Sequence, residues 1–131
     1  MILQVRHAMT GHPHSIPHDA TVTETAMTMI TAGIDTIVVT KKNDIFGAVT
    51  SNDILRYTYT ADFNPAKTPV GSITNEDIML ARPSTSLYDV RNIMTESNTN
   101  TLAVVDKELV GYITLRDLIR VQPEKMEAQV A

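Results

Sequence analysis

The sequence contains no cysteine and no tryptophan, and only 5% of its residues are aromatic. Without cysteine, the chain cannot form a disulfide or a zinc–thiolate site, and thiol catalysis is excluded. No apolar run approaches the ~20 residues needed to span a bilayer, and residues 1–7 lack the layout of a signal peptide. We therefore expect a cytoplasmic protein that has no membrane partner.

Basic residues are also few. The 131 residues include 11 Lys and Arg against 15 Asp and Glu, which gives a net charge of -4 and a pI near 5.4. Proteins bind nucleic-acid backbones and anionic membranes through basic surfaces, so neither is an expected partner. The content of 43% hydrophobic and 20% charged residues is that of an ordinary globular chain.

Motifs that would indicate catalysis are absent as well. The sequence has no Gly-x-Ser-x-Gly, no phosphate-binding Walker loop and no Gly-x-Gly-x-x-Gly. We therefore predict that the chain is not an enzyme and has no catalytic residues.

The chain does contain one motif twice. Residues 47–53 (GAVTSND) and 111–117 (GYITLRD) both read Gly-x-(Val/Ile)-Thr-x-x-Asp. In each copy, a strand-like apolar alternation leads into a Thr that can cap a helix, with the Asp in the first helical turn. A helix N-terminus attracts anions, and a carboxylate can accept hydrogen bonds from two sugar hydroxyls. The motif thus suits a phosphate and a ribose, although a capping box needs no ligand.

The two motifs belong to a repeat that spans the chain. An offset of 65 positions pairs Val22 with Leu87 and Thr36 with Thr101, and one deletion in the polar turn at 41–44 changes the offset to 64. Turns tolerate such changes best. The predicted organisation is a first repeat at 1–59, a linker at 60–69, a second repeat at 70–122 and a tail at 123–131.

The residue pattern of each repeat predicts a short strand followed by a helix, two strands and a second helix. The expected elements are strands at 15–16, 37–39 and 45–49 with helices at 22–32 and 53–59, then strands at 78–81, 102–105 and 109–113 with helices from 87 and 115. Gly33 should end the first helix, whose buried face is predicted to carry Val22, Ala26, Met29 and Ile30. We expect Met27, Met29 and Met94 to fill the core.

This doubled pattern resembles a tandem pair of CBS domains, called a Bateman module. The resemblance runs from about Val5 to Arg120 and includes the opening phrases at 5–10 (VRHAMT) and 70–74 (VGSIT). It implies an α/β fold of two pseudo-twofold related units, each a small three-stranded sheet with two helices, packed sheet to sheet. It also implies a regulatory module that binds AMP, ADP, ATP or S-adenosylmethionine in the cleft between the repeats and acts on a separate effector protein.

The resemblance also assigns site residues: the Asp of each motif would hold the ribose hydroxyls, and the Thr would meet the phosphate. One site would combine Thr50, Asp53, Thr74, Met79, Thr99 and Asn100, and the other Thr114, Asp117, Thr10, His14, Ile34 and Asp35. Arg116 adds a guanidinium beside the second motif. In the first motif, the residues at the corresponding place are Ser51 and Asn52, which offer only neutral donors. We expect the Thr114 site to prefer phosphorylated ligands, unless Arg116 extends into solvent.

Two other interpretations stay open. The chain could be a ligand-independent dimerisation or assembly module, and the resemblance implies a homodimer formed through helices beside the cleft. All four histidines, His7, His12, His14 and His18, fall within twelve positions, which leaves a metal-binding protein as a third interpretation. No helical His-x-x-x-His pair is present, and we predict no metal site.

Overall fold

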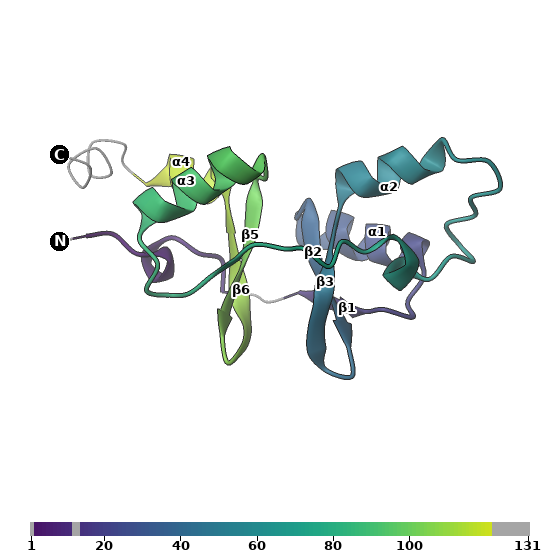
Figure 1. Ribbon diagram of the computed structural model, residues 1–131, viewed down its shortest axis with the longest axis horizontal. Coiled ribbons are helices and arrows are strands. Elements are labelled where there is room, and N and C mark those ends of the chain that lie inside the picture. Colours follow the sequence, from purple (N-terminus) through teal and green to yellow (C-terminus); the bar gives the residue numbers. More distant parts are fainter. Residues whose placement is uncertain (1, 12–13, 122–131) are drawn as a thin grey trace. The chain divides into compact units, whose positions relative to one another are not determined.

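The computed structural model describes residues 2–11 and 14–121 (Figure 1). His12 and the predicted tail at 123–131 lie outside the described residues. In chain order the elements are the 3-10 helix η1 (Val5–His7), β1 (Ser15–Pro17), α1 (Val22–Ala32), β2 (Thr36–Lys41), β3 (Asp44–Thr50), α2 (Ser51–Thr58), the 3-10 helix η2 (Val70–Ile73), β4 (Leu80–Ala81), α3 (Leu87–Ser97), β5 (Thr101–Asp106), β6 (Glu108–Thr114) and α4 (Leu115–Arg120).

The chain forms two compact units that exchange the opening segments of the predicted repeats. The middle unit is His14–Ile78, and the terminal unit is Met1–Pro13 with Met79–Ala131. In the terminal unit, the backbone N–H of Val5 donates to the carbonyl of Thr85. In the middle unit, the N–H of Val70 donates to the carbonyl of Ala20. The opening segment of each repeat therefore packs with the other repeat, and the compact units differ from the predicted domains.

Both units contain the same three-stranded sheet. In the middle unit β2 lies between β1, which is parallel to it, and β3, which is antiparallel, and β5 lies likewise between β4 and β6 in the terminal unit. With α1 and α2 in one unit and α3 and α4 in the other, the predicted α/β class of two units, each with a three-stranded sheet and two helices, is confirmed.

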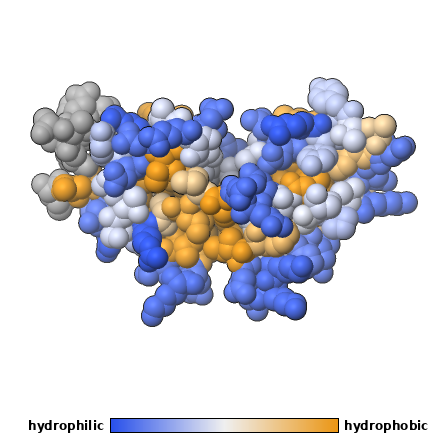
Figure 2. All heavy atoms as spheres, in the orientation of Figure 1, coloured by the Kyte–Doolittle hydropathy of each residue, from blue (hydrophilic) through white to orange (hydrophobic). Residues whose placement is uncertain are grey.

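The single deletion between the repeats falls in the hairpin turn, as predicted. Lys42 and Asn43 adopt positive φ in the turn between β2 and β3, whereas Lys107 alone does so between β5 and β6. Before the turn, both hairpins have an irregular register at the same place, after the pairs Val39 with Gly47 and Val104 with Gly111. The ends of both hairpins carry polar side chains (Figures 1 and 2).

Local capping sets the limits of the first helix of each unit. The hydroxyl of Thr21 accepts the N–H of Glu24 before α1, and Gly33 ends this helix with φ of 69°. Ser86 accepts the N–H of Asp89 before α3 in the same way. The predicted bounds of α1 at 22–32 are thereby confirmed. They could be predicted from the sequence because capping hydrogen bonds join residues only a few positions apart.

The buried face of α1 differs from the predicted one. Val22 and Met29 are buried as expected, but Ile30 is 74% exposed and Met27 is 59% exposed, so the predictions for these two were wrong. Thr25 is buried in their place. Its hydroxyl donates to the carbonyl of Thr21, which removes the cost of burying it.

Three other predicted elements change their limits. The predicted linker at 60–69 is part of the middle unit, where Phe63 packs against the core and Val22 donates its N–H to the carbonyl of Thr68. The helix expected from 53 begins at 51, because Thr50 is its N-cap and Asp53 its third residue. The strand expected at 78–81 is reduced to β4. None of the described helices is long and apolar enough to cross a bilayer.

We predict that a methyl group at Gly47 destabilises the protein. Ala48 and Asn75 exchange two backbone hydrogen bonds of 2.9 Å, and a Cβ at position 47 would clash with the Asn75 carbonyl. Gly47→Ala should therefore lower the free energy of unfolding by about 1–3 kcal/mol, measured by urea denaturation. Gly11→Ala is the control, since no atom lies within 4 Å of its Cβ position. Equal midpoints for the two variants would contradict the prediction.

Candidate functional site

Both copies of the motif form the same reciprocal cap where a strand runs into a helix. Thr50 Oγ1 accepts the N–H of Asp53 at 3.0 Å, and Asp53 Oδ2 accepts the N–H of Thr50 at 3.0 Å. In the terminal unit, Thr114 and Asp117 make the same two bonds at 3.1 and 2.9 Å. The predicted capping box is confirmed in both units. It uses one carboxylate oxygen of each Asp and leaves the other for a further partner.

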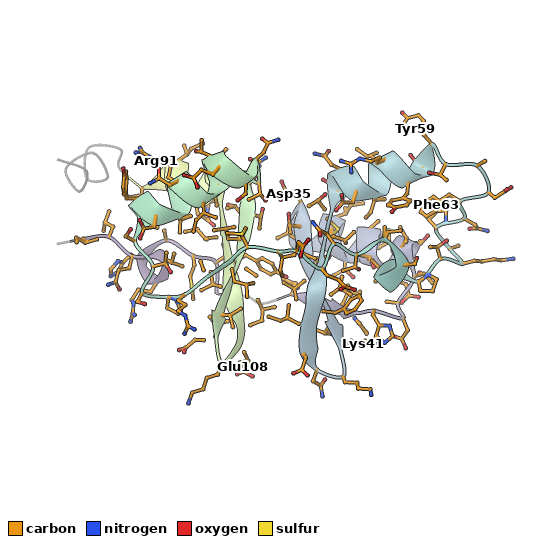
Figure 3. The ribbon with its side chains drawn as sticks, in the orientation of Figure 1. Asp35, Lys41, Tyr59, Phe63, Arg91 and Glu108 are labelled. Carbon is orange, nitrogen blue, oxygen red and sulfur yellow. The ribbon has the colours of Figure 1, made fainter. Side chains whose placement is uncertain are left out.

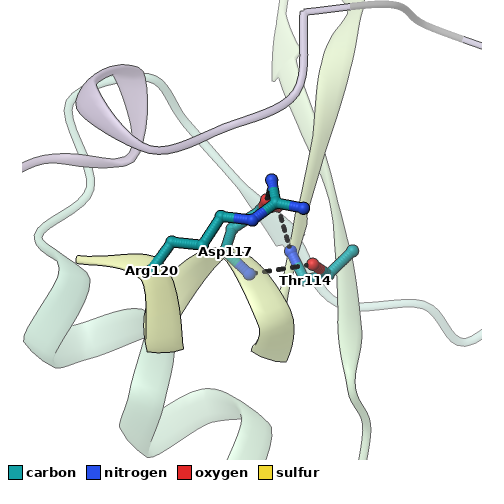
Figure 4. A network of polar contacts seen from close by, with 3 residues as sticks. All are labelled: Thr114, Asp117 and Arg120. Atoms are coloured by element: carbon teal, nitrogen blue, oxygen red, sulfur yellow. Dashed lines mark hydrogen bonds and ion pairs between the residues drawn. The ribbon is translucent and has the colours of Figure 1, made fainter.

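The other carboxylate oxygen faces an arginine three residues later. Arg56 Nη1 lies 3.9 Å from Asp53 Oδ1, and Arg120 Nη1 lies 3.5 Å from Asp117 Oδ1 (Figure 4). Sequence reasoning missed both arginines. The signal was present, because the repeats share Asp-x-x-Arg and residues at this spacing lie on one helix face.

The two carboxylates differ in exposure although their motifs match. The Asp53 side chain is 23% exposed, whereas that of Asp117 is 4% exposed. The next residue follows the same trend, because Leu118 is buried and Ile54 is only half-buried. The N-terminal turn of α4 is therefore more deeply buried than that of α2, and solvent reaches Asp53 more easily than Asp117.

The start of each hairpin lies beside the helix start of its own unit. The N–H of Ser51 donates to the carbonyl of Asp35 at 2.9 Å, and that of Leu115 donates to the carbonyl of Asn100 at 2.8 Å. The backbone of Asp35 is thus next to the Thr50 motif within the middle unit. The family pattern assigned Asp35 to the Thr114 site and Asn100 to the Thr50 site, so those assignments need residues from both units.

The opening segments approach the motifs through Thr10 and Asn75, which corrects one predicted site residue. Thr10 exchanges two backbone hydrogen bonds with Tyr112. Asn75 does the same with Ala48, so Asn75 rather than Thr74 is the counterpart of Thr10. The Thr74 hydroxyl donates to the Val70 carbonyl at 2.8 Å. The repeat offset of 65 pairs Thr10 with Asn75, and Asn75 was missed because the second opening phrase was ended at Thr74.

The remaining predicted residues are divided between the units. Met79 and Thr99 belong to the terminal unit, where Met79 is 48% exposed and the Thr99 hydroxyl donates to the carbonyl of Thr101. His14 and Ile34 belong to the middle unit. His14 borders a groove of about 420 Å³ whose other lining residues are Met27, Thr28, Thr31 and Ala32. Each predicted site draws on both units and stays a prediction.

The histidines provide little support for a metal centre. His7 Nδ1 accepts the N–H of Gln4 at 2.9 Å and so serves to cap η1. Within residues 2–11 and 14–121, which leave out His12, there is no group of three or more His, Asp or Glu side chains placed to hold a metal ion.

Comparison with known families identifies the class of protein. The model of the CBS domain matches the chain twice, at residues 5–59 and 70–124. The chain therefore belongs to the CBS-domain family, as its doubled motif predicted. A pair of CBS domains is a regulatory module, and no enzyme family is indicated.

A curated relative and several solved structures are similar to this chain. Uncharacterized protein MJ0450 of Methanocaldococcus jannaschii is 27% identical over 116 residues, which are 86% of this chain and 62% of the relative. This chain therefore spans less than two thirds of that relative.

The CBS domain pair of protein MJ0100 in complex with 5′-methylthioadenosine and S-adenosyl-L-methionine is 21% identical, with a TM-score of 0.83 over 92% of this chain and 96% of that one. Hypoxic Response Protein I with two coordinated zinc ions is 22% identical, with a TM-score of 0.80 over 92% of this chain and 99% of that one. At these identities, the two structures support the fold alone.

We predict that the two motif carboxylates contribute unequally to stability without any ligand. Replacing either Asp by Ala leaves a backbone N–H without its acceptor, and the cost rises with burial. Asp117→Ala should lower the free energy of unfolding by about 1–3 kcal/mol, and Asp53→Ala should lower it by less. Urea denaturation of the two variants measures the difference, and a larger loss for Asp53→Ala would show the ranking to be wrong.

Proposed function

We propose that the chain is a regulatory module that binds an adenosine compound, such as AMP, ADP, ATP or S-adenosylmethionine, at the Thr50 motif. The observation that carries this proposal is the environment of Asp53. One of its oxygens caps the Thr50 N–H, while the other lies 3.9 Å from an arginine whose side chain is 77% exposed. Such a carboxylate, itself partly exposed, can accept hydrogen bonds from the two hydroxyls of a ribose.

The surrounding groups suit the rest of such a ligand. Thr50 and Ser51 stand at the N-terminus of α2, where the helix dipole favours a negatively charged phosphate. The Asp35 and Asn75 backbones lie beside the same junction. The similar CBS pair of MJ0100, which is in complex with 5′-methylthioadenosine and S-adenosyl-L-methionine, supports an adenosine compound as the class of ligand.

The residues of the other unit complete the proposal. We assign Met79, Thr99 and Asn100 to the adenine end of the Thr50 site. We also propose that ligand binding regulates a separate effector protein. The second motif, Thr114 with Asp117, would use Thr10, His14, Ile34 and Asp35 in the same way, with Arg116 adding a positive charge.

The prediction is that adenosine compounds stabilise the protein through Asp53. In a thermal-shift screen, AMP, ADP, ATP, S-adenosylmethionine or 5′-methylthioadenosine should raise the melting temperature, since a ligand at 100 times its dissociation constant adds about 2.7 kcal/mol. Asp53→Asn keeps an oxygen to cap Thr50 but loses the charge. Its affinity should fall about tenfold or more, because hydrogen bonds to charged groups contribute about 1.5–3 kcal/mol.

GMP serves as the control for base recognition. If none of the five adenosine compounds shifts the melting temperature, or if Asp53→Asn binds as tightly as the wild type, the proposed function is wrong.

A second candidate function is assembly, favoured by an apolar face on the helices of the middle unit. Met27 and Ile30 of α1 are 59% and 74% exposed, and Leu55 of α2 is 58% exposed. Tyr59, the C-cap of α2, is 91% exposed and points away from the helix (Figure 3). At the repeat offset of 65, α3 carries Asn92 and Thr95 in place of Met27 and Ile30. The two units therefore differ at α1 and α3, whereas α4 exposes Ile119 (69%) at the position of Leu55. We propose that the apolar face of α1 and α2 forms a homodimer with its own copy.

If the apolar face forms the homodimer, two matched substitutions should affect the assembly differently. Ile30→Arg should shift the protein toward a monomer near 14.4 kDa in sedimentation velocity, because a buried unpaired guanidinium opposes association. Thr95→Arg, at the equivalent exposed position of α3, should leave the assembly intact. A wild type that is monomeric at every concentration, with and without AMP, would contradict this proposal.

A further inference from the structure

We propose that Arg120 closes the second motif, so that the chain binds one adenosine ligand, at Asp53, until Arg120 is displaced. The ligand stoichiometry rests on the proposed function, whereas the closure itself is a property of the free protein. The two motifs are matched at every position that the binding chemistry requires, since both supply Thr and Asp. Their difference therefore lies in what surrounds the carboxylate.

Asp117 already has a protein partner at each of its two carboxylate oxygens. Asp117 Oδ2 accepts the N–H of Thr114 at 2.9 Å, and Asp117 Oδ1 accepts a hydrogen bond from Arg120 Nη1 at 3.5 Å. Figure 4 shows the guanidinium of Arg120 folded back over the carboxylate. Both oxygens are thus engaged by the protein, and the two hydroxyls of a ribose would have to compete with a cation for one of them.

The two carboxylates also differ in how easily a ligand can reach them. The Asp117 side chain is 4% exposed, compared with 23% for Asp53. Arg56, the counterpart of Arg120, stands 3.9 Å from Asp53 Oδ1, beyond hydrogen-bond distance. A ribose can therefore approach Asp53 with Arg56 in place, but it can reach Asp117 only after a covering group moves.

The residues around Asp117 differ in how easily they can move. Leu118 is buried in the core of the terminal unit, and this anchors the turn of α4 that carries Asp117. Arg120, in contrast, has a side chain that is 69% exposed. An arginine on the surface can move once its charged hydrogen bond to Asp117 is broken, whereas the buried leucine cannot move without disturbing the core. Arg120 is therefore the part of the closed arrangement that a ligand or a substitution can remove.

Closure of the second motif reverses the ranking of the two sites that Arg116 suggested from sequence. Arg116 is exposed on α4. Its charge can attract the phosphate of a ligand only if Asp117 binds the ribose of the same ligand. With Asp117 covered, the arginine that decides the behaviour of this motif is Arg120, and it acts against binding.

Carboxylate labelling tests the closure without any ligand. A carbodiimide with glycine ethyl ester should modify Asp117 several-fold more slowly than Asp53, as read by mass spectrometry of peptides from the folded chain. Arg120→Ala should raise the rate at Asp117 several-fold, while the matched Arg56→Ala should leave the rate at Asp53 nearly unchanged. Equal rates at the two carboxylates in the wild type, or no increase in both Arg120→Ala and Arg120→Gln, would overturn the closure.

Calorimetry with AMP and with 5′-methylthioadenosine tests the stoichiometry. The wild type should bind one molecule per chain, Arg120→Ala two, and Arg56→Ala one. Asp53→Asn should lose the single site, and the double variant Asp53→Asn with Arg120→Ala should regain one. Two sites per chain in the wild type would overturn the inference. If neither compound binds any variant, the proposed function and the stoichiometry fail together, and labelling still decides the closure.

Discussion

Each unit of this protein depends on the reciprocal hydrogen bonds between a threonine and an aspartate at the junction of strand and helix. These bonds satisfy two backbone N–H groups that the first helical turn would otherwise leave without a partner. They also fix the direction in which α2 leaves β3 and α4 leaves β6. The carboxylate that holds the junction is the group that we assign to ribose binding. Structure and candidate function therefore share the same carboxyl group, through its two different oxygens.

A second constraint comes from the close approach of the opening segments to the sheets. The backbones of Thr10 and Asn75 bond to Tyr112 and Ala48, and the neighbouring glycines at 111 and 47 leave no space for a side chain. Each opening segment comes from the repeat that supplies the other unit. Neither compact unit is therefore made of one continuous repeat, and the candidate sites inherit residues from both parts of the chain.

The two copies have diverged mainly in what surrounds their shared motif. Asp117 is 4% exposed with Arg120 at 3.5 Å from its carboxylate, whereas Asp53 is 23% exposed with Arg56 at 3.9 Å. On the helices, α1 presents Ile30 where α3 presents Thr95. A fold built from two units of the same topology can in this way carry the proposed ligand binding and the proposed self-association on one unit. Regulation by such a module would then depend on one site rather than on two equivalent ones.

The sequence by itself determined the repeat, the CBS family, the bounds of α1 and the position of the deletion in the hairpin turn. These features follow from residues close together in the chain, such as Thr21 with Glu24, or from a pattern that both copies repeat. Only the tertiary structure decided that Thr25 rather than Ile30 is buried, that the backbone of Asn75 is hydrogen-bonded to Ala48, and that Asp53 and Asp117 differ in exposure. Burial and pairing of this kind depend on segments far apart in the chain. The same local motif is compatible with an open carboxylate and with a covered one, because the atoms that cover it are set by packing around the helix.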